Sequence, residues 1–77
     1  MSGRAKSAAS RALGAAIRAA RSERGYSQER FAAHAGLDRS YFGAVERGEF
    51  NITLDMLTTI AAGLRLPAWE LLMRAKL

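Results

Sequence analysis

The stretch from Ser27 to Gly48, SQERFAAHAGLDRSYFGAVERG, constrains the fold more than any other part of this 77-residue chain. Its residue types predict two short helices that meet at a corner, Gln28 to Ala35 and Arg39 to Arg47. Gly36 lies between them, where a tight turn needs a residue free to take a positive φ. Asp38 can accept hydrogen bonds from the free amides that begin the second helix. The stretch therefore predicts a helix-turn-helix.

The apolar residues of this stretch support the same arrangement. A single continuous helix would carry Gly36 and Asp38 in mid-run, where neither residue type is favoured. Gly48 follows at the position where glycine commonly ends a helix. The side chains expected to face inward are Phe31, Ala32, Ala35, Leu37, Phe42 and Val45.

Helical spacing also predicts a helix before this stretch, from about Ser10 to Arg24. Gly25 follows it as the expected end, Tyr26 is expected to pack into the core, and Ser27 can cap the next helix. The apolar face of the first helix is Ala12, Leu13, Ala16, Ile17 and Ala20. Residues 1–10 are small, polar and basic, so we expect a flexible basic arm that is either disordered or in contact with DNA, helical from about Ala8 onward.

Two more helices are predicted after Gly48. Thr53 can cap the fourth, and Pro67 suits the first position of the fifth. The inward face of the fourth helix is expected to be Leu54, Leu57, Ile60, Ala61 and Leu64. One side of the fifth carries Trp69, Leu72 and Met73. Residues 11–77 thus form one domain of an all-α class with five helices, the second and third forming the helix-turn-helix.

Composition excludes several classes of protein. The chain has no cysteine and a single histidine, His34, so we expect no disulfide, no metal site and no cofactor. We find no paired carboxylates, no nucleophile with a nearby base and no glycine loop for phosphate, which argues against an enzyme. No apolar run approaches the roughly 20 residues that span a bilayer, and no secretory signal is visible. A cytoplasmic protein without a membrane or small-molecule partner is expected.

The net charge is +5, and ten of the twelve basic residues are arginine. A basic domain with this composition is suited to a polyanion, because guanidinium groups bind phosphate and guanine through two hydrogen bonds. A solvated surface is the alternative, and charge alone does not decide between them.

Three short motifs resemble the XRE family of phage-repressor-like regulators. They are Gln28-Glu29-Arg30-Phe31-Ala32, Ala35-Gly36-Leu37 and Val45-Glu46-Arg47-Gly48. Asp38-Arg39-Ser40-Tyr41 and Asn51-Ile52-Thr53-Leu54 are similar to the controller proteins of restriction–modification systems. The resemblance covers roughly Leu13 to Leu72. It implies a DNA-binding transcriptional regulator, with an antitoxin or a small phage or mobile-element repressor as alternatives.

In such a helix-turn-helix the second helix enters the major groove of double-stranded DNA. Residues of that helix that do not serve the core then face base edges. We expect these to be Arg39, Ser40, Gly43 and Ala44. Arg39 can reach guanine through two hydrogen bonds, and Ala44 can meet a thymine methyl group.

A second set is expected at DNA phosphates: Gln28, Tyr41, Arg47, Asn51 and Thr53. The resemblance places Gln28 at the DNA backbone, and its position at a helix start favours an anion. Simple capping is the alternative for Gln28, dipole compensation for Arg47 and packing at the core edge for Tyr41.

Two structural predictions complete the site. Resemblance and helix geometry bring Arg21 toward Glu46, so we expect an ion pair that neutralises the carboxylate; Arg21 on a phosphate is the alternative. The resemblance also implies a homodimer on a partly symmetric operator. The apolar residues expected at its interface are Leu66, Trp69, Leu72, Met73 and Leu77. Alternatively, Trp69 closes the core of the monomer.

Overall fold

The computed structural model describes residues 7–77, and this range contains five α-helices and no strand. The helices are α1 (Ala8–Glu23), α2 (Gln28–Ala35), α3 (Arg39–Glu46), α4 (Leu54–Gly63) and α5 (Ala68–Arg74). The all-α class predicted from the sequence is therefore confirmed. Across these residues no helix combines the length and the apolar character needed to cross a membrane.

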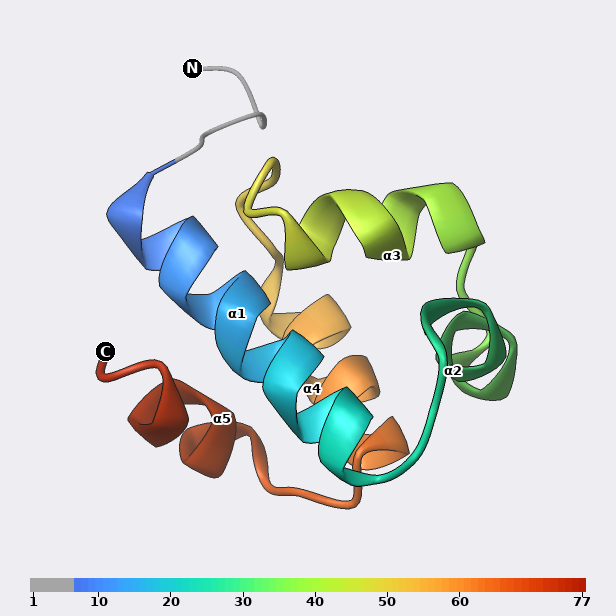
Figure 1. Ribbon diagram of the computed structural model, residues 1–77. Helices are drawn as coiled ribbons and strands as arrows, with labels where there is room; N and C mark the ends of the chain where they lie inside the picture. Colours follow the sequence, from blue (N-terminus) through green and yellow to red (C-terminus); the bar gives the residue numbers. More distant parts are fainter. Residues whose placement is uncertain (1–6) are drawn as a thin grey trace.

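The helices surround one core. α1 packs against α3 and α5, α2 packs against α3 and α4, and α4 packs against α5. Figure 1 shows α3 and α5 on opposite sides of the molecule, with α1 and α4 between them. The outer side of α3 therefore faces away from the C-terminal helix.

Local chemistry explains the two helices of the corner. The Ser27 hydroxyl accepts from the Arg30 amide at 3.0 Å, and an Asp38 carboxylate oxygen accepts from the Tyr41 amide at 2.9 Å. Gly36 has φ of 73° and ends α2 in the left-handed region. These bounds agree with the sequence-based ones, except that α3 ends one residue earlier than expected.

The first helix differs at its start. It begins at Ala8, because the Ser7 hydroxyl accepts from the Ser10 amide at 3.1 Å and caps the helix there. It ends at Glu23 rather than Arg24. Residues 8–10 of the expected arm are thus helical, as anticipated, whereas residues 1–6 lie outside the described part.

The core joins all five helices. Its largest fully buried side chains are Phe31, Phe42, Ile17, Ile60, Leu64 and Leu71. The rings of Phe31 and Phe42 lie 5.0 Å apart and connect α2 to α3. Of the inward set expected around the corner, Ala32 and Val45 are also buried, while Ala35 and Leu37 are half-buried.

Two expectations for the C-terminal half are wrong. Leu54 is 73% exposed at the start of α4, although it shares the helical spacing of the buried residues. Pro67 has ψ of 150° and precedes α5 as its cap instead of opening the helix. The core face of α5 is Leu71 and Ala75, so the side that carries Trp69 points away from the core.

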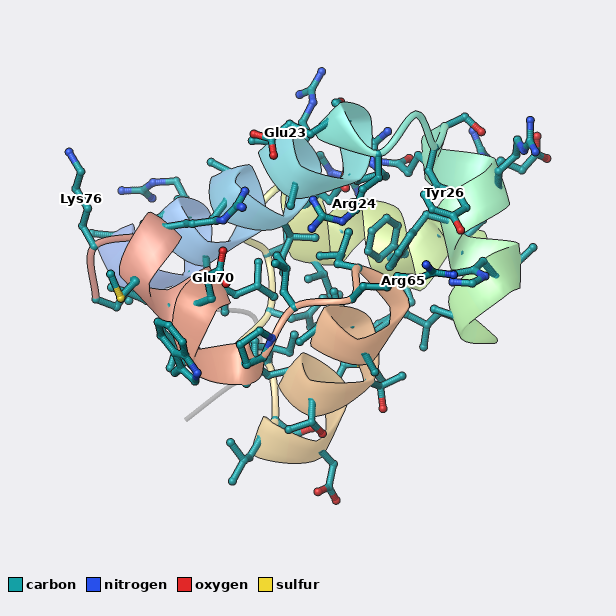
Figure 2. The ribbon with its side chains drawn as sticks, turned by 90° about the horizontal axis from the view of Figure 1, so that it is seen from below. Glu23, Arg24, Tyr26, Arg65, Glu70 and Lys76 are labelled. Carbon is teal, nitrogen blue, oxygen red and sulfur yellow. The ribbon has the colours of Figure 1, made fainter. Side chains whose placement is uncertain are left out.

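Tyr26 packs into the core as predicted, with its ring edge on Phe31 at 5.5 Å. Figure 2 shows Tyr26 with Arg24 and Arg65, where the α1–α2 turn meets the α4–α5 connection. Both arginines follow the C-terminal ends of helices, where a positive charge complements the helix dipole.

Candidate nucleic-acid interface

The outer face of α3 carries exposed polar residues. Arg39 and Ser40 occupy the first two positions of the helix, and Arg47 caps its end; all three are exposed. Phe42 and Val45 on the inner face are buried. The inner face of the helix thus packs against the core and the outer face is open to solvent, as expected. Arg39 and Ser40 are therefore available to a ligand.

The middle of α3 differs from the expectation. Ala44 is 6% exposed, which leaves it too little surface for a thymine methyl group, so we remove it from the base-reading set. Gly43 is buried as well, although it lies on the outer face. The end of the Gln28 side chain and the guanidinium of Arg47 cover it. A Cβ atom at Gly43 would lie 3.1 Å from Gln28 Oε1 and 3.2 Å from Arg47 Nη1.

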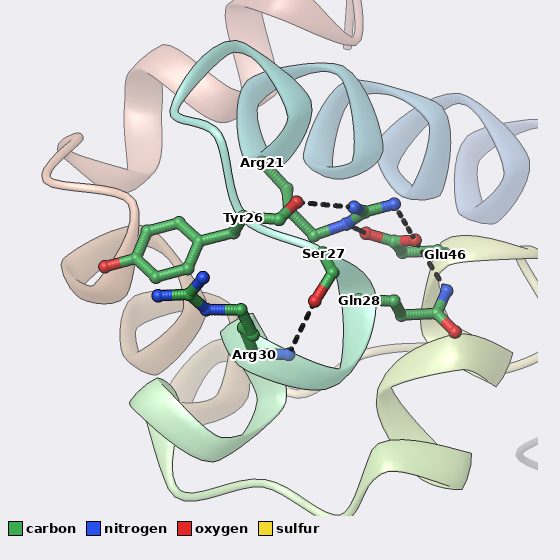
Figure 3. Close-up of polar contacts among 6 residues, drawn as sticks. All are labelled: Arg21, Tyr26, Ser27, Gln28, Arg30 and Glu46. Atoms are coloured by element: carbon green, nitrogen blue, oxygen red, sulfur yellow. Dashed lines mark hydrogen bonds and ion pairs between the residues drawn. The ribbon is translucent and has the colours of Figure 1, made fainter.

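The predicted ion pair between Arg21 and Glu46 is present and buried (Figure 3). Arg21 Nε lies 2.7 Å from Glu46 Oε2, and Arg21 Nη2 donates to Glu46 Oε1 at 3.1 Å. Arg21 Nη1 also donates to the Tyr26 carbonyl at 2.9 Å. One guanidinium therefore ties the end of α1 to α3 and to the α1–α2 turn.

Gln28 is hydrogen-bonded to this ion pair, a contact that was not predicted from the sequence. Its Nε2 donates to Glu46 Oε1 at 2.8 Å, so the side chain bridges α2 and α3 (Figure 3). The capping role belongs to Ser27 instead. A glutamine at a helix start gave no signal for this bond, because the partner lies 18 residues further along the chain.

A second ion pair follows α3. Arg47 Nε donates to Glu49 Oε2 at 2.7 Å. The hydrogen bond to Glu49 and the negative charge of that carboxylate raise the pKa of Arg47 above its ordinary value. Arg47 therefore stays cationic at the edge of the α3 face. Glu49 was not among the predicted site residues.

The remaining predicted phosphate contacts are Asn51 and Thr53, in the connection between α3 and α4, and Tyr41 on α3. Asn51 Oδ1 accepts from the Ser10 hydroxyl at 3.1 Å, which ties this connection to α1. Thr53 caps α4 as expected. Tyr41 packs at the core edge with its ring 5.4 Å from Phe50. Packing is thus one role of Tyr41, and a phosphate contact by its hydroxyl stays a prediction.

The residues predicted for a dimer interface fall into two groups. Trp69 is 61% exposed and Met73 is 64% exposed, and Leu77 is exposed as well. Trp69 therefore does not close the core of the monomer. Leu66 and Leu72 are half-buried and pack against the core.

Within residues 7–77 no group of three or more histidine, cysteine, aspartate or glutamate residues could hold a metal ion. The polar groups of the site are instead organised as two ion pairs around α3.

Comparison with known proteins places this geometry in a family. A family model described as helix-turn-helix matches residues 17–68. A "Neisseria hypothetical transcription factor" from Neisseria meningitidis is 44% identical over 57 residues, which cover 74% of this chain and 54% of that protein. "Control protein C.MunI" from a Mycoplasma species is 47% identical over 45 residues, covering 58% of this chain and 61% of that protein. The chain thus spans less than two thirds of the length of either relative.

Solved structures agree with this placement. The restriction–modification controller protein C.AhdI from Aeromonas hydrophila has a TM-score of 0.76 and 41% identity, covering 79% of this chain and 92% of that one. The controller protein C.Esp1396I, described as a tetramer in complex with its natural 35 base-pair operator, has a TM-score of 0.79 and 29% identity. It covers 92% of this chain and 99% of that one.

Proposed function

The chain belongs to the helix-turn-helix family, and from this membership we propose that it is a sequence-specific DNA-binding regulator of transcription. The observation that carries the proposal is the outer face of α3. Arg39, Ser40 and Arg47 are exposed there, while two buried contacts, the Arg21–Glu46 pair and the inner-face packing, hold the helix at a fixed angle.

The chemistry of this face suits the major groove. Arg39 at the N-terminal end of α3 supplies the paired donors that match guanine O6 and N7. Arg47 and Thr53 at the edge of the face suit phosphates, as do the amides that begin α2 at Gln28. Asn51 lies beside them. Phosphate contacts fix the position of the protein on DNA, and base contacts supply sequence preference.

We propose further that the protein binds a partly symmetric operator as a homodimer. Trp69 and Met73 are one helical turn apart and leave an apolar face of α5 in solvent. The helix α5 lies on the opposite side of the molecule from α3 (Figure 1), so it can pair with a second copy while α3 stays accessible. The operator-bound tetramer of C.Esp1396I supports an oligomer on DNA.

The names of the similar proteins support a more specific proposal about which genes are regulated. Because two of the proteins compared are named restriction–modification controller proteins, we propose that this chain controls genes of such a system. It would act in the cytoplasm as a binding protein and not as an enzyme. Recovery of bound fragments from the source genome would test this, since fragments away from any methyltransferase or endonuclease gene would contradict it.

Arg39→Ala tests the base-reading role. We expect it to weaken binding to the preferred DNA site by roughly 5- to 150-fold, equivalent to about 1–3 kcal/mol. Binding to random DNA should fall far less, because phosphate contacts remain. The measurement is a competition titration of preferred and random DNA at one fixed salt concentration.

Arg65→Gly is the matched control for this titration. It removes the same charge from the α4–α5 connection, away from α3 (Figure 1). Arg65 has a φ of 59°, a left-handed backbone conformation that glycine adopts without strain. Equal losses for Arg39→Ala on preferred and random DNA would remove Arg39 from the base-reading set.

Trp69→Ala and Met73→Glu test the dimer. Truncating a central interface tryptophan costs about 2 kcal/mol or more, so we expect sedimentation to show monomers where the wild type is dimeric. Both side chains are exposed, so circular dichroism should show unchanged helix content. Leu54→Glu is the control, because it changes another exposed apolar residue on α4. A dimer that survives both α5 variants and dissociates with Leu54→Glu would move the interface to α4.

A further inference from the structure

We propose that Gln28 and Arg47 read base edges together across the bare backbone of Gly43. The inference rests on the proposed function and reassigns two side chains, Gln28 on α2 and Arg47 at the C-terminal cap of α3, from phosphates to base edges. Gly43 has no side chain, so the ends of Gln28 and Arg47 can both approach the outer face of the helix at this position.

The position of Gly43 is the first observation. It follows Arg39 by four residues and precedes Arg47 by four, so all three share the outer face of α3. Gly43 is nevertheless buried. A Cβ atom there would lie 3.1 Å from Gln28 Oε1 and 3.2 Å from Arg47 Nη1. The ends of these two side chains therefore border the space in which a residue at position 43 would present its own side chain to DNA, and a Cβ atom there would need them to give by a few tenths of an ångström.

The orientation of the Gln28 amide is the second observation. Glu46 presents carboxylate oxygens, which already accept from Arg21. A carboxylate accepts and does not donate here, so Gln28 must turn Nε2 toward it, at 2.8 Å. Oε1 then faces α3 (Figure 3). A carbonyl oxygen repels phosphate, but it accepts from the exocyclic amino group of adenine or cytosine in the major groove.

Arg47 supplies the complementary group. Its Nε is held by Glu49 at 2.7 Å, which leaves the terminal nitrogens for other partners, and Nη1 lies beside Gly43. Guanidinium donors match guanine O6 and N7. The Gln28 carbonyl and the Arg47 guanidinium together present an acceptor beside donors, which is the pattern that distinguishes base pairs in the major groove.

Two carboxylates act through these side chains. Glu46 accepts from Gln28 Nε2 and Glu49 accepts from Arg47 Nε, and the two carboxylate side chains are only 2% and 19% exposed. We therefore assign Glu46 and Glu49 as positioning residues for the reading pair.

Gly43→Ala is the central test, with DNA selected from a random-sequence pool by the full chain. The added Cβ meets only the ends of flexible side chains, and alanine favours a helix over glycine. The variant should therefore fold with an unchanged or higher thermal midpoint. We expect it to shift the ends of Gln28 and Arg47 by a few tenths of an ångström and to weaken the preference at one or two base pairs of each half-site by less than the roughly 5- to 150-fold of a lost bidentate contact.

Gln28→Met is the second variant, because it keeps the length of the side chain and removes the amide. It should relax the same base pairs as Gly43→Ala and leave the preference supplied by Arg39 intact. Arg65→Gly should select the wild-type motif. If Gly43→Ala and Gln28→Met keep every base preference and only bind all sequences more weakly, Gln28 and Arg47 contact phosphates and the inference is overturned. A wild type that selects no motif would instead overturn the proposed function.

Discussion

Glu46→Ala is expected to lower the free energy of unfolding by about 3–5 kcal/mol, because it leaves the guanidinium of Arg21 buried without its partner. The Glu46 side chain is 2% exposed and accepts from both Arg21 and Gln28. Native proteins have only about 5–15 kcal/mol in total, so this loss would remove a large part of the stability. Chemical denaturation monitored by circular dichroism measures the change.

Two control variants separate the effect of burial from the effect of charge on the free energy of unfolding. Glu23→Ala removes a carboxylate whose pair with Arg74 is exposed, and such pairs are worth about 0–1 kcal/mol. The double variant Arg21→Met with Glu46→Leu should recover much of the loss, since apolar residues often replace a buried ion pair at little cost. A Glu46→Ala variant no less stable than Glu23→Ala would show that the pair does not hold α1 to α3.

The parts of the fold that could be predicted are those governed by local chemistry. Ser27 and Asp38 cap the helices that follow them, and Gly36 takes the positive φ that the corner needs. Each depends on atoms within three or four residues, so the sequence contains the whole interaction. The bounds of α2 followed directly from these residues.

Packing between distant segments could not be predicted in the same way. The fifth helix offers one apolar face with Trp69 and Met73 and another with Leu71 and Ala75. Helical spacing alone does not say which of them faces the core. Leu54 shares the spacing of the buried residues of α4 yet lies beyond the edge of the core, where it is exposed.

The same distinction applies to the site. The Arg21–Glu46 pair was predictable because the resemblance and the helix geometry both bring the two residues together. The hydrogen bond from Gln28 to Glu46 could not be predicted, because it depends on where α3 places Glu46. The Glu49 carboxylate was missed for a similar reason, because only the folded connection after α3 brings it 2.7 Å from Arg47 Nε.

Gly14→Ala is expected to be the most damaging small substitution in α1. A Cβ atom at Gly14 would lie 2.5 Å from the Glu46 carbonyl oxygen and 2.6 Å from that of Val45. These are backbone atoms at the end of α3 that cannot rotate away, so the two helices must move apart. Overpacking costs about 1–3 kcal/mol, and the roughly 1 kcal/mol that alanine gains over glycine in a helix offsets part of it, so we expect a net loss of up to about 2 kcal/mol.

Gly43→Ala provides the matched comparison for this loss, because both glycines are helical and gain the same methyl group. At Gly43 the new Cβ meets only side-chain ends, whereas at Gly14 it meets backbone. The thermal midpoint should therefore rise or stay level for Gly43→Ala and fall for Gly14→Ala, by roughly 4–8 °C for each kcal/mol lost.

The separation of α1 from α3 should also loosen the Arg21–Glu46 pair, so the losses of Gly14→Ala and Glu46→Ala should not be additive. Additive losses, or a Gly14→Ala variant as stable as Gly43→Ala, would mean that the close approach of the two helices does not set the angle of α3.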